Sequence, residues 1–170
     1  MLLYSFENIS IKSKTIKSKV ANKKIIVLRD PANFISSFMK YYDPNSKTIS
    51  YVIKIYKEYL RAYKMLKNNF NYIFINYNKF IIDLDYRKNI SAKIENHRFQ
   101  MAEFAINITT DFGGGSSFSG SNLPKDVFSR WKFYKSNKHF LNYLQDEELT
   151  TLSLIFFNQD LPGYKELGLI

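Results

Sequence analysis

Residues 25–37 read IIVLRDPANFISS, and this stretch determines how the rest of the chain is interpreted. The apolar, β-branched run predicts a buried strand over 23–30 that ends in charged residues. Asp30 is a good N-cap and Pro31 suits the first helical position, so a helix should follow directly. Arg29 would then stand at the exit of a strand beside a helix N-terminus, where α/β folds commonly hold anions.

The remaining apolar patterns alternate between those typical of strands and those typical of helices. Residues 2–6 and 71–77 are short apolar runs, as expected for strands. Residues 49–67 carry apolar side chains at helical spacing, residues 85–94 repeat that spacing more weakly, and DPNSK at 43–47 indicates a turn. This alternation predicts an α/β fold with a parallel sheet covered by helices.

Length and composition indicate one globular domain over residues 1–170. The chain is 45% hydrophobic and 17% aromatic, which is enough to bury a core. It contains no cysteine, which excludes disulfides and thiolate metal sites, and no metal is predicted. There is no apolar run near the roughly 18 residues of a membrane span. The first residues, MLLYSFENISIK, do not resemble a signal peptide, so a cytoplasmic location is expected.

The formal net charge of +10 raises the question of a nucleic-acid partner. The excess comes mostly from lysines scattered along the chain, whereas arginine, the better reader of bases and phosphates, is sparse. We therefore predict no specific nucleic-acid recognition. The charge is equally compatible with an anionic nucleotide.

Two interpretations of the opening stretch follow from its residues. In the first, Arg29 and a hydroxyl of Ser36 or Ser37 hold a phosphate together. In the second, Arg29 and Asp30 form a local ion pair and the serines only solvate a helix.

The same residues resemble a known motif. LRDPANFISS looks like the 3′-phosphate-binding motif of the sulfotransferase superfamily, whose donor is 3′-phosphoadenosine 5′-phosphosulfate (PAPS). That motif has an Arg at a strand end and a Ser eight positions later, matched here by Arg29 and Ser37. The stretch starting at INYNKF resembles the segment in which a Tyr contacts the adenine, and Tyr77 is the matching position. The resemblance implies a parallel-sheet, P-loop-type three-layer fold and an adenine nucleotide carrying a 3′-phosphate as partner.

The later segments GGGSSFSG and SRWKFY look like a bacterial branch of sulfotransferase-like P-loop proteins. Glycine backbones with neighbouring hydroxyls can form an anion-binding concavity. The residues expected to contact the nucleotide here are Gly114, Gly115, Ser116, Ser117 and Arg130, with Lys132 as an alternative to Arg130. The competing interpretation of the glycine run is a surface turn.

Sulfuryl transfer also needs a base that takes the acceptor's proton. By resemblance, Glu7 falls at the position of that base, 22 residues before Arg29; alternatively it is an exposed residue at a strand end. His97 and His139 have no comparable support and are expected at a helix end and on a helix face. A carbohydrate acceptor is expected only by analogy with relatives that use a Glu base.

One part of the family pattern is not found. Sulfotransferases hold the 5′-phosphosulfate in a loop similar to PKSGTT, which precedes the strand matched here by residues 2–6. No such loop occurs in the sequence. We therefore expect a domain that lacks its first strand and phosphate-binding loop, a truncated or degenerate homologue with exposed sheet edges. Loss of such a cradle should abolish most activity.

Three functions remain open. The chain is a sulfotransferase-like protein, active only if the missing loop is supplied; or a non-catalytic nucleotide-binding or interaction domain; or a basic protein associated with nucleic acid.

Overall fold

The computed structural model describes residues 23–94 and 128–170. Several sequence predictions lie outside the described residues: the strand over 2–6, Glu7, His97, and the glycine–serine residues Gly114, Gly115, Ser116 and Ser117. In the described part, none of the helices combines the length and apolar character needed to cross a membrane.

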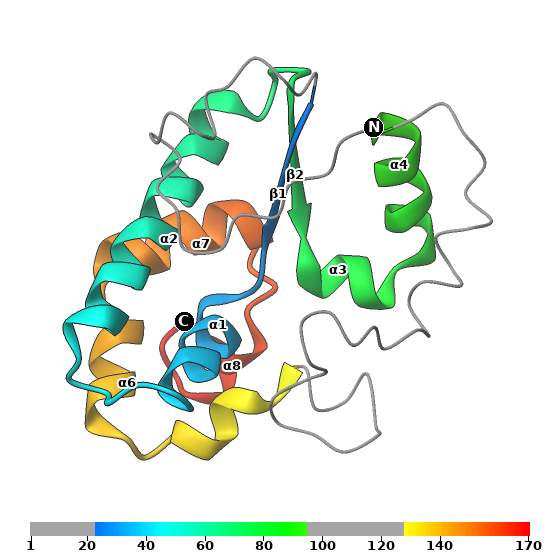
Figure 1. Cartoon of the computed structure of the whole chain (residues 1–170). Coiled ribbons are helices and arrows are strands. Elements are labelled where there is room, and N and C mark those ends of the chain that lie inside the picture. The colour runs from blue at the N-terminus through cyan, green and yellow to red at the C-terminus, as the bar shows by residue number, and fades with distance from the viewer. Residues whose placement is uncertain (1–22, 95–127) are drawn as a thin grey trace.

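The described residues form a two-stranded parallel sheet of β1 (Lys24–Leu28) and β2 (Tyr72–Asn76). Lys24 lies opposite Tyr72 and Leu28 lies opposite Asn76. Parallel strands need a long crossover, and helices α1 and α2 supply it (Figure 1). Because the two strands are parallel and their last residues, Leu28 and Asn76, are paired, both strands end at the same edge of the sheet.

Helix α1 (Pro31–Met39) confirms the prediction made from the opening stretch. The Asp30 side chain caps its N-terminus by accepting a hydrogen bond from the backbone N–H of Asn33, and Pro31 is the first helical residue. Ile35 is 1% exposed and faces the core.

Helix α2 (Lys47–Leu66) is the helix predicted over 49–67, and it begins two residues earlier. Ser46 caps it by accepting a hydrogen bond from the backbone N–H of Ile49. A side chain that satisfies one of the free N–H groups of a first turn lets the helix begin at this point.

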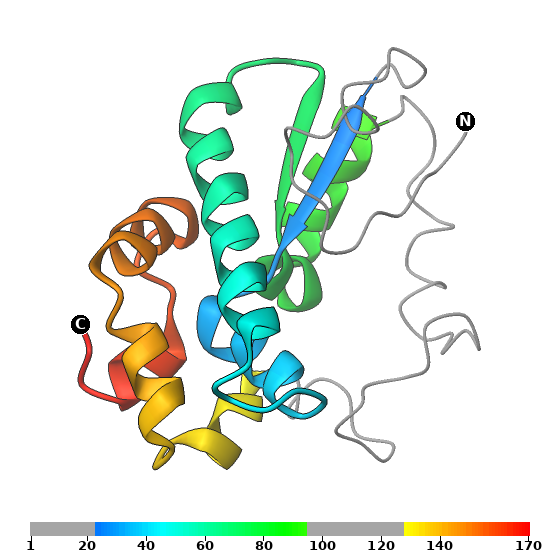
Figure 2. The same cartoon turned by 60° about the vertical axis from the view of Figure 1, so that its left-hand side comes forward.

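The two faces of the sheet are covered by different helices. Ile26 and Leu28 of β1 pack with buried residues of α2, whereas Ile73 and Ile75 of β2 pack with Ile90 on the opposite face. Figure 1 shows the strands between α2 and α4, and in Figure 2 α4 lies behind the strands.

Two helices follow β2 without an intervening loop. Helix α3 (Tyr77–Ile82) begins where the sequence predicted the last residue of a strand, and α4 (Leu84–Ile94) is the helix predicted over 85–94. The side chain of Asn76 caps α3 by accepting from the backbone N–H of Lys79. The strand is therefore shorter than predicted, and Tyr77 is helical.

In the carboxyl-terminal part, residues 128–170, every regular element is a helix. It contains η2 (Arg130–Tyr134), a short 3₁₀ helix, followed by α6 (Lys138–Leu144), α7 (Glu147–Phe157) and α8 (Pro162–Glu166). Helix η2 and helix α8 contact α1, and α7 contacts α2. The main core therefore joins the carboxyl-terminal helices to the α2 face of the sheet.

The observed fold is a mixed α/β arrangement, mostly helical, with a small parallel sheet. This agrees with the α/β class and the parallel pairing predicted from the sequence. On the α4 side, the residues of β1 are not covered by any described element, and Ile25 is 37% and Val27 54% exposed. Strands covered on both faces are usually apolar throughout, and β1 has that composition although only one of its faces is buried.

Candidate functional site

Two residues predicted to contact a ligand meet at the carboxyl edge of the sheet. Arg29 follows β1 and Tyr77 follows β2, and the pairing of Leu28 with Asn76 brings them together. The guanidinium carbon of Arg29 lies 4.4 Å from the centre of the Tyr77 ring. Both side chains are partly exposed. A cation over an aromatic face at this distance is attracted to the ring and is held in place by it.

The backbone of Arg29 is anchored from α2. The Tyr56 hydroxyl donates a hydrogen bond to the Arg29 carbonyl, and Tyr56 is 3% exposed. Phe34 of α1 stacks on Tyr56, with ring centres 4.4 Å apart. The strand exit is thus fixed by one helix at its carbonyl and by a second helix through the stacked ring.

Asp30 points inward and is not paired with Arg29. Its carboxylate accepts from the backbone N–H of Asn33 at 3.0 Å and from the Asn33 amide at 2.9 Å. Burial raises the pKa of the Asp30 carboxyl, while the hydrogen bonds from Asn33 and the proximity of Asn78 and Arg29 oppose that rise. The described residues contain no salt bridge between Arg29 and Asp30, so the ion pair of the second interpretation is not found, although the Arg29 charge still favours the ionised carboxyl.

Asn78 is a residue that sequence reasoning missed. It is 3% exposed, and its amide lies close enough to the buried Asp30 carboxylate to favour the ionised form and so to lower the pKa of that carboxyl. The one available signal was the polar sequence Asn76-Tyr77-Asn78 at the end of a strand.

The two serines of the opening stretch bond to their own helix. Ser36 is buried and donates to the Ala32 carbonyl at 2.6 Å, and Ser37 is partly exposed and donates to the Phe34 carbonyl at 2.6 Å. Ser37, the residue matched by the resemblance, is therefore the more accessible of the two hydroxyls.

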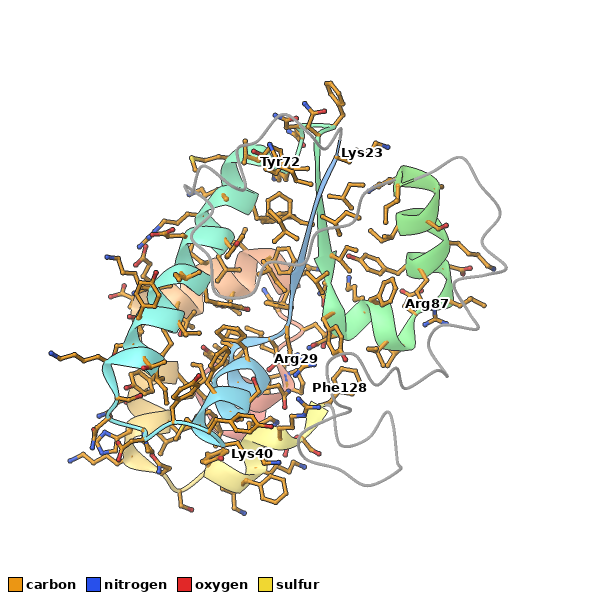
Figure 3. All side chains as sticks on the ribbon, viewed as in Figure 1. Lys23, Arg29, Lys40, Tyr72, Arg87 and Phe128 are labelled. Atoms are coloured by element: carbon orange, nitrogen blue, oxygen red, sulfur yellow. The ribbon has the colours of Figure 1, made fainter. Side chains whose placement is uncertain are left out.

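The segment that leads into η2 is attached to α1 at the same end of the sheet. The Phe128 carbonyl accepts hydrogen bonds from the Asn33 amide at 3.2 Å and from the Trp131 indole N–H at 3.1 Å. Figure 3 labels Arg29 and Phe128 near this edge. Arg130, predicted to contact the nucleotide, is 5% exposed in η2. We call the two hydrogen bonds that the Phe128 carbonyl accepts, from Asn33 and from Trp131, the Phe128 clamp.

His139 lies on α6, as expected for a helix-face residue. It is partly exposed, and its backbone N–H donates to the side chain of Asn137, which caps the helix. Its position therefore follows from the capped start of α6.

The carboxyl edge therefore combines a cation and an aromatic face, supplied by Arg29 and Tyr77. Such a set can bind a ligand that has both an anionic group and a planar base. No family model matches the chain, and neither the curated proteins nor the solved structures give a significant match to it.

Proposed function

We propose that the chain binds an adenine nucleotide carrying a 3′-phosphate at the carboxyl ends of β1 and β2. The observation that carries the proposal is the placement of the Arg29 guanidinium over the Tyr77 ring, 4.4 Å from its centre. In this proposal Arg29 binds the phosphate and Tyr77 contacts the base.

A nucleotide suits this pair better than a simple anion does. One ribose joins the base to the 3′-phosphate, so a site for both needs a cation and an aromatic ring close together, as found here. An inorganic phosphate would use Arg29 but gain nothing from Tyr77.

Ser37 is the proposed second ligand of the phosphate. Its hydroxyl bonds to the Phe34 carbonyl in this structure, so it would have to rotate toward the ligand and give up that bond. Exchanging one hydrogen bond for another to a charged group is favourable. Arg130 and the glycine–serine residues at 114–117 remain predicted contacts.

On the same basis we propose a relationship to sulfotransferases, with PAPS as the donor and a parallel-sheet, P-loop-type three-layer fold. PAPS would supply the sulfuryl group that passes to a hydroxyl or amine, and a carbohydrate is the proposed acceptor. Glu7 is the proposed base. Whether transfer occurs is separate from binding, because the loop that holds the 5′-phosphosulfate is not recognisable in the sequence. A cytoplasmic location stays a prediction.

Thermal unfolding with adenosine 3′,5′-bisphosphate tests the binding proposal. A ligand that binds only the folded state raises the melting temperature with its concentration. We expect the bisphosphate to stabilise the protein and adenosine 5′-monophosphate to do so less, because it lacks the 3′-phosphate. Arg29→Ala should remove the difference between the two ligands, and Arg29→Lys should restore part of it.

The matched control is Arg61→Ala, since Arg61 is an exposed arginine that pairs with Glu148 on another part of the surface. It should leave the response to the bisphosphate unchanged. Equal responses to the two nucleotides, or a full response in Arg29→Ala, would overturn the proposal. Transfer of labelled sulfate from PAPS then separates an enzyme from a non-catalytic nucleotide-binding domain.

A further inference from the structure

The beginning of α2 and the turn before it carry alternating lysines and tyrosines. The residues are Lys40, Tyr41, Tyr42, Lys47, Tyr51 and Lys54, which we call the lysine–tyrosine patch. Its tyrosines are exposed to an unusual degree: Tyr41 to 65%, Tyr42 to 45% and Tyr51 to 55%. Lys40 is labelled in Figure 3 at the end of α1, far from the amino ends of the strands.

Helical spacing gathers the α2 part of the patch on one side. Lys47, Tyr51 and Lys54 are separated by four and three residues, the intervals at which side chains become neighbours on a helix surface. All three are exposed. The helix therefore presents a ring between two ammonium groups.

The turn that holds the other tyrosines is well anchored. The Tyr143 hydroxyl donates to the Pro44 carbonyl at 2.7 Å, and the Asp43 carboxylate accepts from the backbone N–H of Asn45 at 2.7 Å. The ring of Tyr42 stacks on Phe38 with centres 6.4 Å apart. Rings held in place in this way lose little freedom when a ligand binds to them.

The charges on α2 are distributed unevenly. In its second half, Lys57 and Arg61 are neutralised by Asp146 and Glu148 of α7. In its first half, Lys47 and Lys54 make no ion pair with any described residue. Exposed lysines occur at both ends of α2, Lys47 and Lys54 at the beginning and Lys64 at the end. Among the described residues, the beginning of the helix is the end at which exposed lysines stand next to the exposed tyrosines of the patch.

We propose that the lysine–tyrosine patch binds single-stranded nucleic acid without sequence preference. Such ligands are bound by cations that follow the phosphates and by aromatic side chains on which unpaired bases stack. Duplexes offer the phosphates but keep their bases stacked inside, so the tyrosines would not contribute. This site is separate from the proposed nucleotide site and does not include Arg29.

Fluorescence anisotropy with a labelled oligo(dT) of twelve nucleotides tests the proposal on the full chain. A small patch of this kind should bind in the range of about 10⁻⁴–10⁻⁶ M for sequence-independent contacts. The double substitution Lys47→Gln with Lys54→Gln should weaken binding and reduce its dependence on salt. The double substitution Tyr41→Ser with Tyr51→Ser should weaken binding about tenfold or more and leave the salt dependence unchanged.

The matched control is Lys64→Gln with Lys67→Gln, which removes the same charge from the other end of α2, where both lysines are exposed. It should bind oligo(dT) nearly as well as the unaltered chain. Circular dichroism checks that each variant folds. Response to adenosine 3′,5′-bisphosphate should persist in the patch variants, and Arg29→Ala should bind oligo(dT) normally, so the two proposals fail independently.

Four results would overturn the proposal. They are no binding of oligo(dT) at low salt, an equal loss in the control variant, no loss in the tyrosine variant, and equal binding of a duplex or of heparin. The second result would indicate attraction to the net charge of the protein, and the third and fourth would indicate a site for polyanions in general.

Discussion

Tyr56 and Arg29 are joined by a hydrogen bond from a helix side chain to a strand-end carbonyl. The bond connects α2 to the residue that we propose to bind phosphate. Tyr56 is 3% exposed, and burial raises the pKa of its phenol well above the usual value. The hydroxyl therefore stays protonated and donates over the whole working pH range.

Removal of that hydroxyl should loosen the strand exit. We expect Tyr56→Phe to lower the free energy of unfolding by about 1 kcal/mol, because the Arg29 carbonyl loses its partner. It should also weaken binding of adenosine 3′,5′-bisphosphate. Tyr63→Phe on the same helix is the control, since the Tyr63 ring packs on Phe74 and Phe156 and its hydroxyl makes no hydrogen bond in the described structure. Urea unfolding and ligand titration measure the two effects, and equal changes in both variants would contradict the expectation.

The Phe128 clamp should contribute to stability. Asn33→Ala removes amide bonds to the Asp30 carboxylate and to the Phe128 carbonyl. Because both partners are then left less satisfied, the free energy of unfolding should fall by about 1–3 kcal/mol. Hydrogen exchange should also become faster in the amides of η2. Asn142→Ala, on an exposed position of α6, serves as the control and should change stability by less than about 0.5 kcal/mol.

Gly163 allows α8 to approach α1 closely. A methyl group at this position would lie 2.8 Å from the Ala32 Cβ and 3.2 Å from the Trp131 ring. Gly163→Ala should therefore destabilise the protein by about 1–3 kcal/mol. Combining it with Ala32→Gly removes the nearest contact, so the double variant should be more stable than the sum of the two single effects. Strict additivity in urea unfolding would show that the neighbours move aside without cost.

The ion pairs between α2 and α7 should make the free energy of unfolding depend on pH in the acidic range. Partial burial opposes ionisation of Asp146, but the hydrogen bonds from Lys57 and from the Leu149 backbone prevail and lower its pKa. The Arg61 hydrogen bond lowers the pKa of Glu148 as well. A carboxyl with a lowered pKa in the folded state stabilises above its unfolded pKa of about 3.9, and that contribution disappears as the pH falls through the folded value.

Asp146→Asn tests this dependence and preserves the helix cap. We expect it to be less stable than the unaltered protein by about 0.5–1 kcal/mol at pH 7, since the pair is partly exposed. The difference should shrink as the pH falls through the lowered pKa of folded Asp146, because the carboxyl then becomes protonated in both states. Urea midpoints at several pH values measure it. Asp160→Asn, an exposed position, should show no such trend.

The elements predicted correctly from the sequence are those whose capping residues and apolar spacing lie within the element itself. Asp30 and Pro31 marked the start of α1, and the apolar spacing of 49–67 marked α2, because caps and amphipathic faces depend on neighbouring residues. Helix α3 was missed because the apolar run NYIFINY suggested a strand to residue 77. Asn76, which caps the helix, suits a loop equally well.

The long-range features could not be predicted in the same way. The resemblance assigned Arg29 and Tyr77 to the same nucleotide, but the cation–ring contact between them depends on a register that pairs Leu28 with Asn76. Asn78 was missed because its burial next to Asp30 depends on how α3 packs against the start of α1. Helix α7 has apolar residues on most sides, so TTLSLIFF shows no clear helical period, and its position is determined by contact with α2.

The pairing of β1 with β2 has a kinetic consequence. Lys24 and Tyr72 are 48 residues apart, so the sheet can form only after a long section of chain has been brought into place. Closing that section before other contacts exist costs entropy that a few strand hydrogen bonds do not recover. Helix α2, which is local and amphipathic, should therefore form early and hold Ile26 and Leu28 while the second strand arrives. The rate-limiting step of folding would then be the docking of β2, and variants in α2 would slow folding more than variants in α4.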